Sequence, residues 1–372
     1  PFRGQSSRPF LIEFRDCFCI NDLEQPLKNI PPALVCRVAI HPLRKNEGSY
    51  VDRNLALDLV RVTEAAALSA ATHMGRGDKI LADQAGVDGM RRMFDNIDID
   101  GVVVIGEGEM DEAPMLYIGE QLGRRGPGAP QVDIAVDPVE GTTSVAKGLP
   151  NAIAVVAMAP RGCLLNAPDM YMDKIAVGPK AAGKVSLDAP VHENLKATAE
   201  ALNKSITDLT VTILDRPRHE KLIQECRDAG ARIKLFSDGD VAAALATCFD
   251  YTGVDILLGI GGAPEGVIAA AGIKCLGGQF EGRLVPANDE ERARCQKMGV
   301  SYEKILKMED LAKGEEVYFV ATGISDGELL RGVRYIGNNV AKTHSVMMRS
   351  KTGTIRFIEA IHRLNKKPSY AY

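Results

Sequence analysis

An apolar run of the chain ends in the segment Val136-Asp137-Pro138-Val139-Glu140-Gly141-Thr142-Thr143. The β-branched residues of 132–136 predict a buried strand, which the proline after Asp137 is expected to stop. Asp137 and Glu140 lie three residues apart, and the following glycine permits a turn into Thr142. Such a turn directs two carboxylates and a hydroxyl at one point, where Mg²⁺ or Mn²⁺ is the fitting cation. A solvated surface turn explains the segment equally well when it is considered alone.

A second acidic cluster follows the apolar run Val102–Ile105. Residues 106–114 contain four carboxylates and two glycines. Charge runs of this kind usually cover a solvated face, but a position directly after a core strand favours a cation site. Two more residues are candidates for the same site only in combination with these clusters. Asp83 alone would simply favour the dipole of a helix, and Lys79 alone would be a surface lysine.

Three polar segments follow predicted strands in the second half of the chain. Arg216-Pro217-Arg218 sets two arginines at the expected start of a helix, where they suit a second anionic group of a ligand. Asp238-Gly239-Asp240 is suited either to sugar hydroxyls or to a turn with a helix cap. The glycines of 259–266 indicate close backbone approach, Glu265 opens a helix, and a dinucleotide site is a weak alternative. Metal-assisted hydrolysis of a phosphate ester accounts for all these features.

The 372 residues divide into regions of different pattern. Residues 1–50, with six prolines and no sustained period, are expected to form a poorly ordered extension. We expect a metal-binding lobe at 51–205, a second α/β lobe with a largely parallel sheet at 206–332, and C-terminal strands of unassigned lobe at 333–372. Helices are expected at 52–74, at 82–94, after residues 217, 241 and 266, and at 328–331, and strands at 102–105, 132–136, 153–156, 209–214, 232–236, 255–260, 317–321, 333–336, 345–348 and 355–358.

Composition argues against several classes of protein. The 45 basic and 49 acidic residues leave a net charge of −4, which disfavours a nucleic-acid binder. The longest uncharged run, Gly148–Pro160, has 13 residues and is too short to span a bilayer. Eight cysteines without framework spacing are expected to be free thiols, with Cys17-Phe18-Cys19 as a weak metal signal. These features favour a cytoplasmic protein, and organelle import through residues 1–50 is a weaker alternative.

The element Asp137-Pro138-Val139-Glu140-Gly141-Thr142 resembles the signature of the lithium-sensitive sugar phosphatases, the inositol monophosphatase-like superfamily. Beyond it, the chain from about Asn54 to Lys366 is similar to the class II fructose-1,6-bisphosphatases. Long matches in the family's order are far more specific than a six-residue motif. The matching segments are Gly75–Lys79, Ile105–Glu109, Asp111–Glu120, Asn166–Met172, Pro217–His219, Asp238–Asp240 and Gly261–Gly266.

The resemblance implies an α/β fold, the layered α-β-α-β-α sandwich of the sugar phosphatases with two lobes. It implies at least two Mg²⁺ or Mn²⁺ ions, one held by Asp83 and Glu107 and a second by Asp137, Glu140 and Glu265. The catalytic residues beside the attacking water would be Lys79, Asp111 and Thr142, and we favour a threonine that orients the water over a nucleophile. The implied substrate-binding residues are Glu140, Gly141, Thr142, Tyr171, Arg216, Pro217, Arg218, Asp238, Gly239, Asp240 and Gly262.

The same resemblance implies removal of the 1-phosphate of fructose 1,6-bisphosphate in gluconeogenesis, with sedoheptulose 1,7-bisphosphate as an open second substrate. It implies a cytoplasmic homo-dimer or homo-tetramer without a nucleic-acid or membrane partner. Ile80 and Leu81 replace the Asn-Thr of the family pattern and put the fine positioning of Asp83 in question. Two alternatives stay open. One is a monophosphatase, which would leave Arg216 and Arg218 without an anion, and the other is a non-catalytic protein that binds metal or sugar phosphate.

Overall fold

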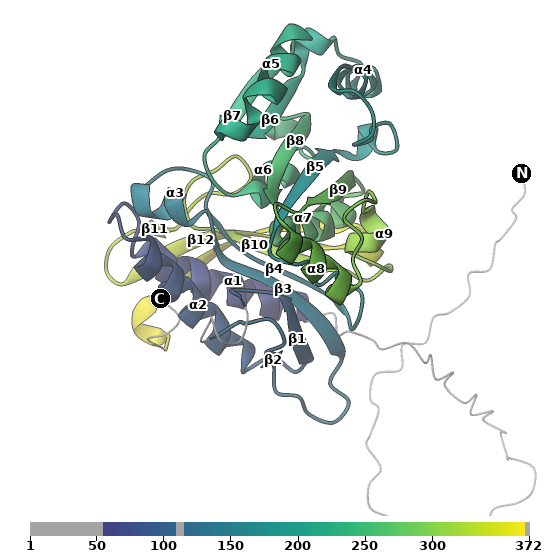
Figure 1. Cartoon of the computed structure of the whole chain (residues 1–372). Helices are drawn as coiled ribbons and strands as arrows, with labels where there is room; N and C mark the ends of the chain where they lie inside the picture. The colour runs from purple at the N-terminus through teal and green to yellow at the C-terminus, as the bar shows by residue number, and fades with distance from the viewer. Residues whose placement is uncertain (1–54, 109–114, 369–372) are drawn as a thin grey trace, which may run out of the picture. The chain divides into compact units, whose positions relative to one another are not determined.

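The computed structural model describes residues 55–108 and 115–368. The expected extension at 1–50 lies outside the described residues, as do Glu109, Asp111 and Glu112 of the second acidic cluster. Within the described ranges, helices cover two mixed sheets, one of eight strands and one of five (Figure 1). The prediction of an α/β fold is therefore confirmed at this level.

The eight-stranded sheet has the order β11-β12-β10-β4-β3-β1-β2, and β13 pairs with β12. Its strands are β1 (Asp100–Ile105), β2 (Gln121–Leu122), β3 (Gln131–Glu140), β4 (Ile153–Pro160), β10 (Tyr318–Gly323), β11 (Arg334–Tyr335), β12 (Val340–Arg349) and β13 (Thr354–Arg363). Strands β1 and β3 run parallel, and the other pairs are antiparallel. The carboxyl ends of β1 and β3, near which Glu107, Asp137 and Glu140 lie, therefore meet at one edge of the sheet.

Helices α1 (Leu55–Ala71) and α2 (Lys79–Phe94) pack on one face of this sheet. Successive side chains of a strand point to opposite faces of the sheet. Val156 of β4 therefore packs in the core with α1 and α2, while Val155 packs in the core on the other face. Helix α2 begins three residues before the expected start at 82, because the Asp78 carboxylate caps it by accepting the Leu81 N–H at 3.0 Å.

The five-stranded sheet has the order β7-β6-β8-β5-β9. Its strands are β5 (Tyr171–Val177), β6 (Thr210–Leu214), β7 (Arg232–Phe236), β8 (Ile256–Gly262) and β9 (Gln279–Val285). Strand β6 is parallel to β7 and β8, but β5 is antiparallel to both β8 and β9. The strands that residues 206–332 contribute to this sheet therefore run in one direction, as expected, and the sheet is mixed because β5 enters it from the opposite end.

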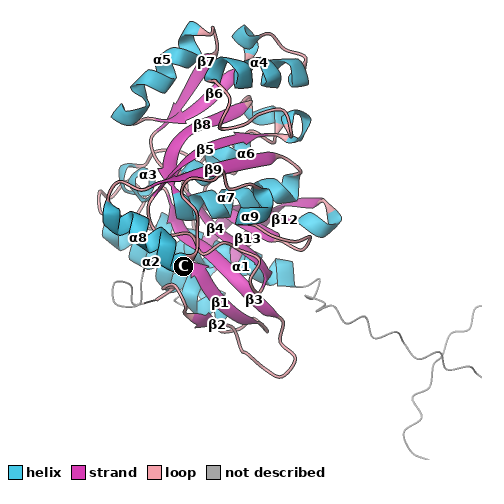
Figure 2. Ribbon diagram, turned by 45° about the vertical axis from the view of Figure 1, so that its right-hand side comes forward, coloured by secondary structure: helices cyan, strands magenta, loops and turns pink. Residues whose placement is uncertain are grey.

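Two helices, α6 (Asp240–Ala246) and α7 (Ala263–Leu276), join a core cluster with strands of both sheets. Helix α7 is apolar around most of its circumference, as expected of a helix enclosed on all sides. Helices α4 (Val191–Leu202) and α5 (Glu220–Asp228) pack with the other face of the five-stranded sheet (Figure 2). The remaining α-helices of the described ranges are α3 (Thr142–Lys147), α8 (Asp289–Met298) and α9 (Met308–Leu311).

Three sequence expectations about the fold need comment. Residues 328–331 form no helix, because residues 326–333 form a loop that hydrogen bonds to Asn151 and to Ile324. The two sheets do not divide at the expected lobe boundaries after residues 205 and 332. Strand β5, before residue 205, belongs to the five-stranded sheet, and β10, before residue 332, belongs to the eight-stranded sheet. In the part of the chain that the structure describes, no helix is long and apolar enough to cross a membrane.

Proline 138 does not stop strand β3, contrary to the sequence prediction. The strand continues to Glu140, and a register shift places four residues of β3, from Asp137 to Glu140, against three of β4, from Val155 to Ile153. This extra residue is a β-bulge, which tolerates proline and reverses the alternation of side chains. Val139 therefore packs into the helix-side core, while Asp137 and Glu140 both face the opposite side.

Candidate active site

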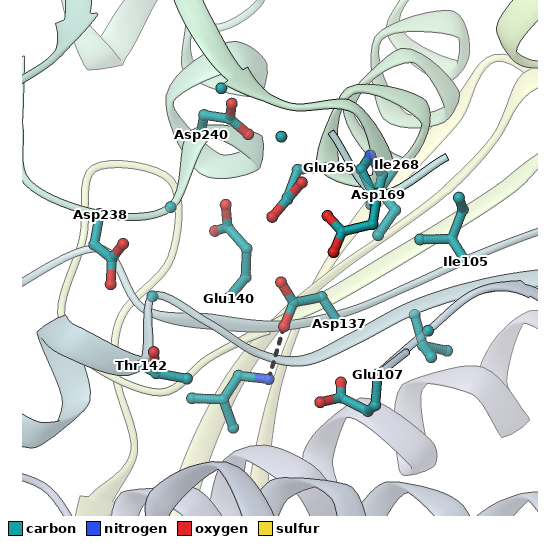
Figure 3. A pocket seen from close by; sticks show the side chains of 18 of the residues that line it. Ile105, Glu107, Asp137, Glu140, Thr142, Asp169, Asp238, Asp240, Glu265 and Ile268 are labelled. Atoms are coloured by element: carbon teal, nitrogen blue, oxygen red, sulfur yellow. Dashed lines mark hydrogen bonds between the residues drawn. The ribbon is translucent and has the colours of Figure 1, made fainter. Parts of the chain in front are cut away.

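A cleft of about 490 Å³ opens where the carboxyl ends of strands from both sheets meet. Residues after β1 and β3 line one side, and residues after β6, β7 and β8 line the other. Ligands of open α/β sheets commonly bind at such carboxyl ends. Figure 3 shows acidic side chains of both sides directed into the same space, with Glu107 after β1 and Asp137 on β3 facing Asp240 of α6 and Glu265 of α7.

Asp137 and Glu140 are held by backbone amides at the bottom of the cleft. Asp137 Oδ1 accepts the Val139 N–H at 3.0 Å within the bulge (Figure 3). Glu140 Oε1 accepts the Val241 N–H at 2.8 Å at the start of α6, so it connects the two sheets. Gly239 is required here, because its φ is +75° and a Cβ would lie 2.7 Å from Glu140 Oε2.

The cluster of Asp83, Glu107, Asp137, Glu140 and Glu265 is electrostatically strained. Burial, followed by repulsion from the neighbouring Asp83 carboxylate, raises the pKa of Glu107 to about 8. Burial also raises the pKa values of Asp137 and Glu140 well above their ordinary range, with repulsion from nearby carboxylates as the second cause. The pKa values of Asp83 and Glu265 are raised, again mainly by burial. A cation bound among these groups would neutralise the repulsion between the carboxylates and offset the cost of burying their charge.

The donor chemistry of the cluster fits a hard divalent cation. Three buried carboxylate oxygens have no hydrogen-bond partner among the described residues, namely Glu140 Oε2, Asp240 Oδ1 and Glu265 Oε2. Buried anionic oxygens are normally paired, so these are available to a ligand. In the described ranges, no group of three or more His, Cys, Asp or Glu side chains is already close enough to hold a metal ion. The carboxylates share one cleft but would have to draw together around a cation.

Lys79 and Thr142 occupy different positions relative to the cleft. Thr142 lines it at the first turn of α3. Lys79 is exposed, does not line the cleft, and donates from Nζ to Thr143 Oγ1 at 2.8 Å. Ile80 and Leu81 also stay outside the lining, with 81% and 53% of their surface exposed.

The opposite side of the cleft carries its basic residues. Arg218 donates from Nε and Nη2 to the Ile260 carbonyl at 3.2 and 2.7 Å, and its guanidinium lies 4.6 Å from the centre of the Tyr171 ring. Arg216 donates to the Ser237 carbonyl at 2.8 Å and faces Asp238 at 3.8 Å. These contacts fix two cations at the rim, where an anionic group of a ligand can reach them.

The buried His219 secures this basic side. Its Nδ1 lies 2.6 Å from the Leu214 carbonyl, and its Nε2 accepts the Ile260 N–H at 2.8 Å. Burial lowers the pKa of His219, so the neutral ring joins the ends of β6 and β8. His219 and Arg218 thus bind opposite sides of the same residue, Ile260, through its N–H and its carbonyl oxygen.

A model of the bacterial, glpX-encoded fructose-1,6-bisphosphatase family matches residues 53–362. The chain belongs to this family. It is 49% identical over 328 residues to "Fructose-1,6-bisphosphatase 1 class 2" of Escherichia coli K12, covering 85% of this chain and 97% of that relative. It shows the same identity and coverage with a class 2 fructose-1,6-bisphosphatase of Shigella flexneri. The resemblance inferred from the motifs is confirmed.

The structure gathers most of the site residues expected from membership of the fructose-1,6-bisphosphatases. Lys79 and Pro217 do not line the cleft, and Asp111 lies outside the described residues. The expected residues that line it are Asp83, Glu107, Asp137, Glu140, Gly141, Thr142, Tyr171, Arg216, Arg218, Asp238, Gly239, Asp240, Gly262 and Glu265.

Sequence reasoning missed Asp169 as a lining residue. Most of the acids that the sequence indicated follow a strand, whereas Asp169 precedes β5. Because β5 is antiparallel to β8 and pairs Tyr171 with Gly262, its amino end lies beside the carboxyl end of β8. An acid just before a strand can reach the cleft only if that strand runs in the reverse direction, and the sequence alone does not give the direction.

Proposed function

We propose that the cleft is where this fructose-1,6-bisphosphatase hydrolyses the 1-phosphate of fructose 1,6-bisphosphate, a step of gluconeogenesis that yields fructose 6-phosphate and phosphate. The observation that carries the proposal is that one cleft holds two kinds of charged group. Five carboxylates with raised pKa values line it, and so do the arginines Arg216 and Arg218. A substrate with two phosphates suits this combination, since one needs cations and the other finds them in the protein.

Asp83 and Glu107 would hold one divalent cation, and Asp137, Glu140 and Glu265 a second. When bound, Mg²⁺ or Mn²⁺ supplies charge neutralisation of phosphate oxygens and a water of lowered pKa. Thr142, at the lip of the cleft, would orient that water through its hydroxyl. Lys79 would act from the rim by holding the Thr143 side chain, which follows Thr142 directly. Asp111 completes the proposed catalytic set.

The sugar-binding half would use neutral and charged contacts together. Arg216 and Arg218 would receive the 6-phosphate, Tyr171 would pack beneath it, and Asp238 and Asp240 would accept hydrogen bonds from sugar hydroxyls. Asp238 is already organised, because its Oδ2 accepts the Thr143 N–H at 2.9 Å. The same half would admit a seven-carbon bisphosphate if the sugar extends along the open cleft.

We further propose that the chain adopts the α-β-α-β-α sandwich of the sugar phosphatases, in two lobes, and acts as a cytoplasmic homo-dimer or homo-tetramer. The packing of α6 and α7 with strands of both sheets supports the layered arrangement. Helices on the two outer faces, α1 and α2 on one and α4 and α5 on the other, support it further.

The proposed activity is tested by the release of phosphate from a panel of substrates. With Mg²⁺ or Mn²⁺, fructose 1,6-bisphosphate should be hydrolysed, and chelator should abolish the reaction. Fructose 1-phosphate, inositol 1-phosphate and sedoheptulose 1,7-bisphosphate complete the panel. Faster hydrolysis of inositol 1-phosphate than of either bisphosphate would favour a monophosphatase, and no turnover of any compound would favour a binding protein.

Replacing Arg218 by alanine is expected to raise the KM for fructose 1,6-bisphosphate by about 10- to 100-fold, the loss expected for one charge-assisted hydrogen bond. The kcat should change little, because Arg218 would bind the 6-phosphate and not the phosphate that is removed. Fructose 1-phosphate, which lacks the 6-phosphate, should show nearly the same KM with both proteins. Arg331→Ala, which removes a surface ion pair with Glu359, is the control. Equal effects on both substrates would place the arginine outside the 6-phosphate site.

A further inference from the structure

Lys174 is a buried lysine beneath the cleft. It lies in the middle of β5, an interior strand of the five-stranded sheet, and only 2% of its surface is exposed. Met172 and Ala176, two residues away on either side, belong to the core cluster that contains α7, so Lys174 projects to the same side as they do. A lysine is rarely buried this deeply without a specific partner.

Its partner is Asp240 at the start of α6. Lys174 Nζ lies 2.5 Å from Asp240 Oδ2. Two glycines leave room for this pair. A Cβ on Gly261 would lie 1.9 Å from Asp240 Oδ2 and 3.0 Å from Lys174 Nζ, and a Cβ on Gly266 would lie 3.3 Å from Lys174 Cε. The glycines that the sequence analysis could only interpret as close backbone approach therefore accommodate a buried ion pair.

The pair leaves one oxygen of Asp240 available. Asp240 lines the cleft, and its Oδ1 is buried without a hydrogen-bond partner in the described ranges (Figure 3). A buried carboxylate with no cation beside it would be free to rotate toward another donor. Because Lys174 Nζ holds Oδ2, the Asp240 side chain is fixed and Oδ1 stays directed at the ligand space.

We propose that Lys174 is a positioning residue that holds Asp240 so that its free oxygen accepts a hydroxyl of the sugar. The inference rests on the proposed function, because it assigns the sugar of the bisphosphate to the Asp240 side of the cleft. Lys174 does not touch the substrate in this role and acts on it through Asp240, although its charge also attracts the nearby Glu265 carboxylate.

A double-mutant cycle with fructose 1,6-bisphosphate and Mg²⁺ tests this role. Lys174→Met, which keeps length without charge, should raise the KM about 10-fold and leave kcat within about twofold, the loss expected for one misdirected hydrogen bond. Asp240→Asn should raise the KM at least as much. If Lys174 acts only through Asp240, the double variant should have the same KM as Asp240→Asn. Additive increases in KM would overturn the proposal, as would an unchanged KM in Lys174→Met.

Two controls keep the outcomes separate. Lys204→Met removes another lysine–aspartate pair, Lys204 Nζ to Asp255 Oδ1 at 2.6 Å, which lies outside the cleft, and it should leave the KM unchanged. If Lys174→Met alone does not fold, the comparison of Asp240→Asn with the double variant still decides, since the double variant leaves no buried charge unpaired. A wild-type protein without bisphosphatase activity would refute the proposed function, whereas an active wild type with a failed cycle refutes only the role of Lys174.

Discussion

Replacing Asp137 by asparagine is expected to lower metal-dependent phosphate release about 10³-fold or more, because a lost ligand forfeits several kcal/mol of transition-state stabilisation. The same substitution should raise the melting temperature of the chelator-treated protein. Burial, then repulsion from Glu107 and Glu140, raises the pKa of Asp137 well above its ordinary value, so the ionised side chain destabilises the fold. Asparagine keeps the shape, and its Oδ1 can still accept the Val139 N–H.

Asp133→Asn is the matched control for this prediction. Asp133 lies on the same strand with 1% of its surface exposed, but its Oδ2 accepts the N–H groups of Cys163 and Leu164 at 2.9 and 3.1 Å. Burial raises the pKa of Asp133 too, but its neighbours are amides and Arg161 instead of other carboxylates. Its replacement should therefore retain activity and give a smaller gain in melting temperature than Asp137→Asn. The measurements are kcat/KM with Mg²⁺ and thermal unfolding with chelator. An active Asp137→Asn variant, or one less stable than wild type in chelator, would contradict the assignment.

The stability of the chelator-treated protein should fall as the pH rises from 6.5 to 8.5. Burial raises the folded-state pKa of Glu107 to about 8, far above its value of 4.5 in an unfolded chain. The folded state therefore retains a proton that the unfolded state has lost, and this stabilisation disappears as the pH passes the folded pKa. One retained proton corresponds to about 1.4 kcal/mol of unfolding free energy per pH unit between the two pKa values.

The pH window is chosen to isolate the carboxylates. Below pH 6.5 the histidines act in the opposite direction, because burial lowers the pKa of His362 to about 4 and folding then disfavours its protonation. Above pH 8.5 the thiols contribute, since burial raises the pKa of Cys226 from 9.0 to about 11. Denaturant unfolding with chelator and with saturating Mg²⁺ provides the test. Bound Mg²⁺ should raise stability and remove or reverse the slope, because it replaces the protons. A slope that is the same with and without Mg²⁺ would contradict a cation site in this cluster.

Much of the local structure could be predicted from the sequence. The apolar runs at 102–105, 132–136 and 153–156 lie within strands β1, β3 and β4, because buried strands need continuous β-branched residues and those residues are adjacent in the chain. The acids after β1 and β3 were also interpretable, since two parallel strands bring their carboxyl ends together. Strands β5 and β9 were missed, because Asp173, Lys174, Glu281 and Arg283 interrupt their apolar pattern.

The motifs determined the family and its chemistry, because residue types in a fixed order are themselves the information that a family shares. Only the tertiary structure decided the geometry of the cleft. The bulge at Pro138 turns Glu140 to the same side as Asp137, which alternation along a regular strand would not allow. The reversed direction of β5 brings Asp169 to the cleft and sets Lys174 beneath Asp240. Each of these depends on register or strand direction, and both are settled by packing between segments far apart in the chain.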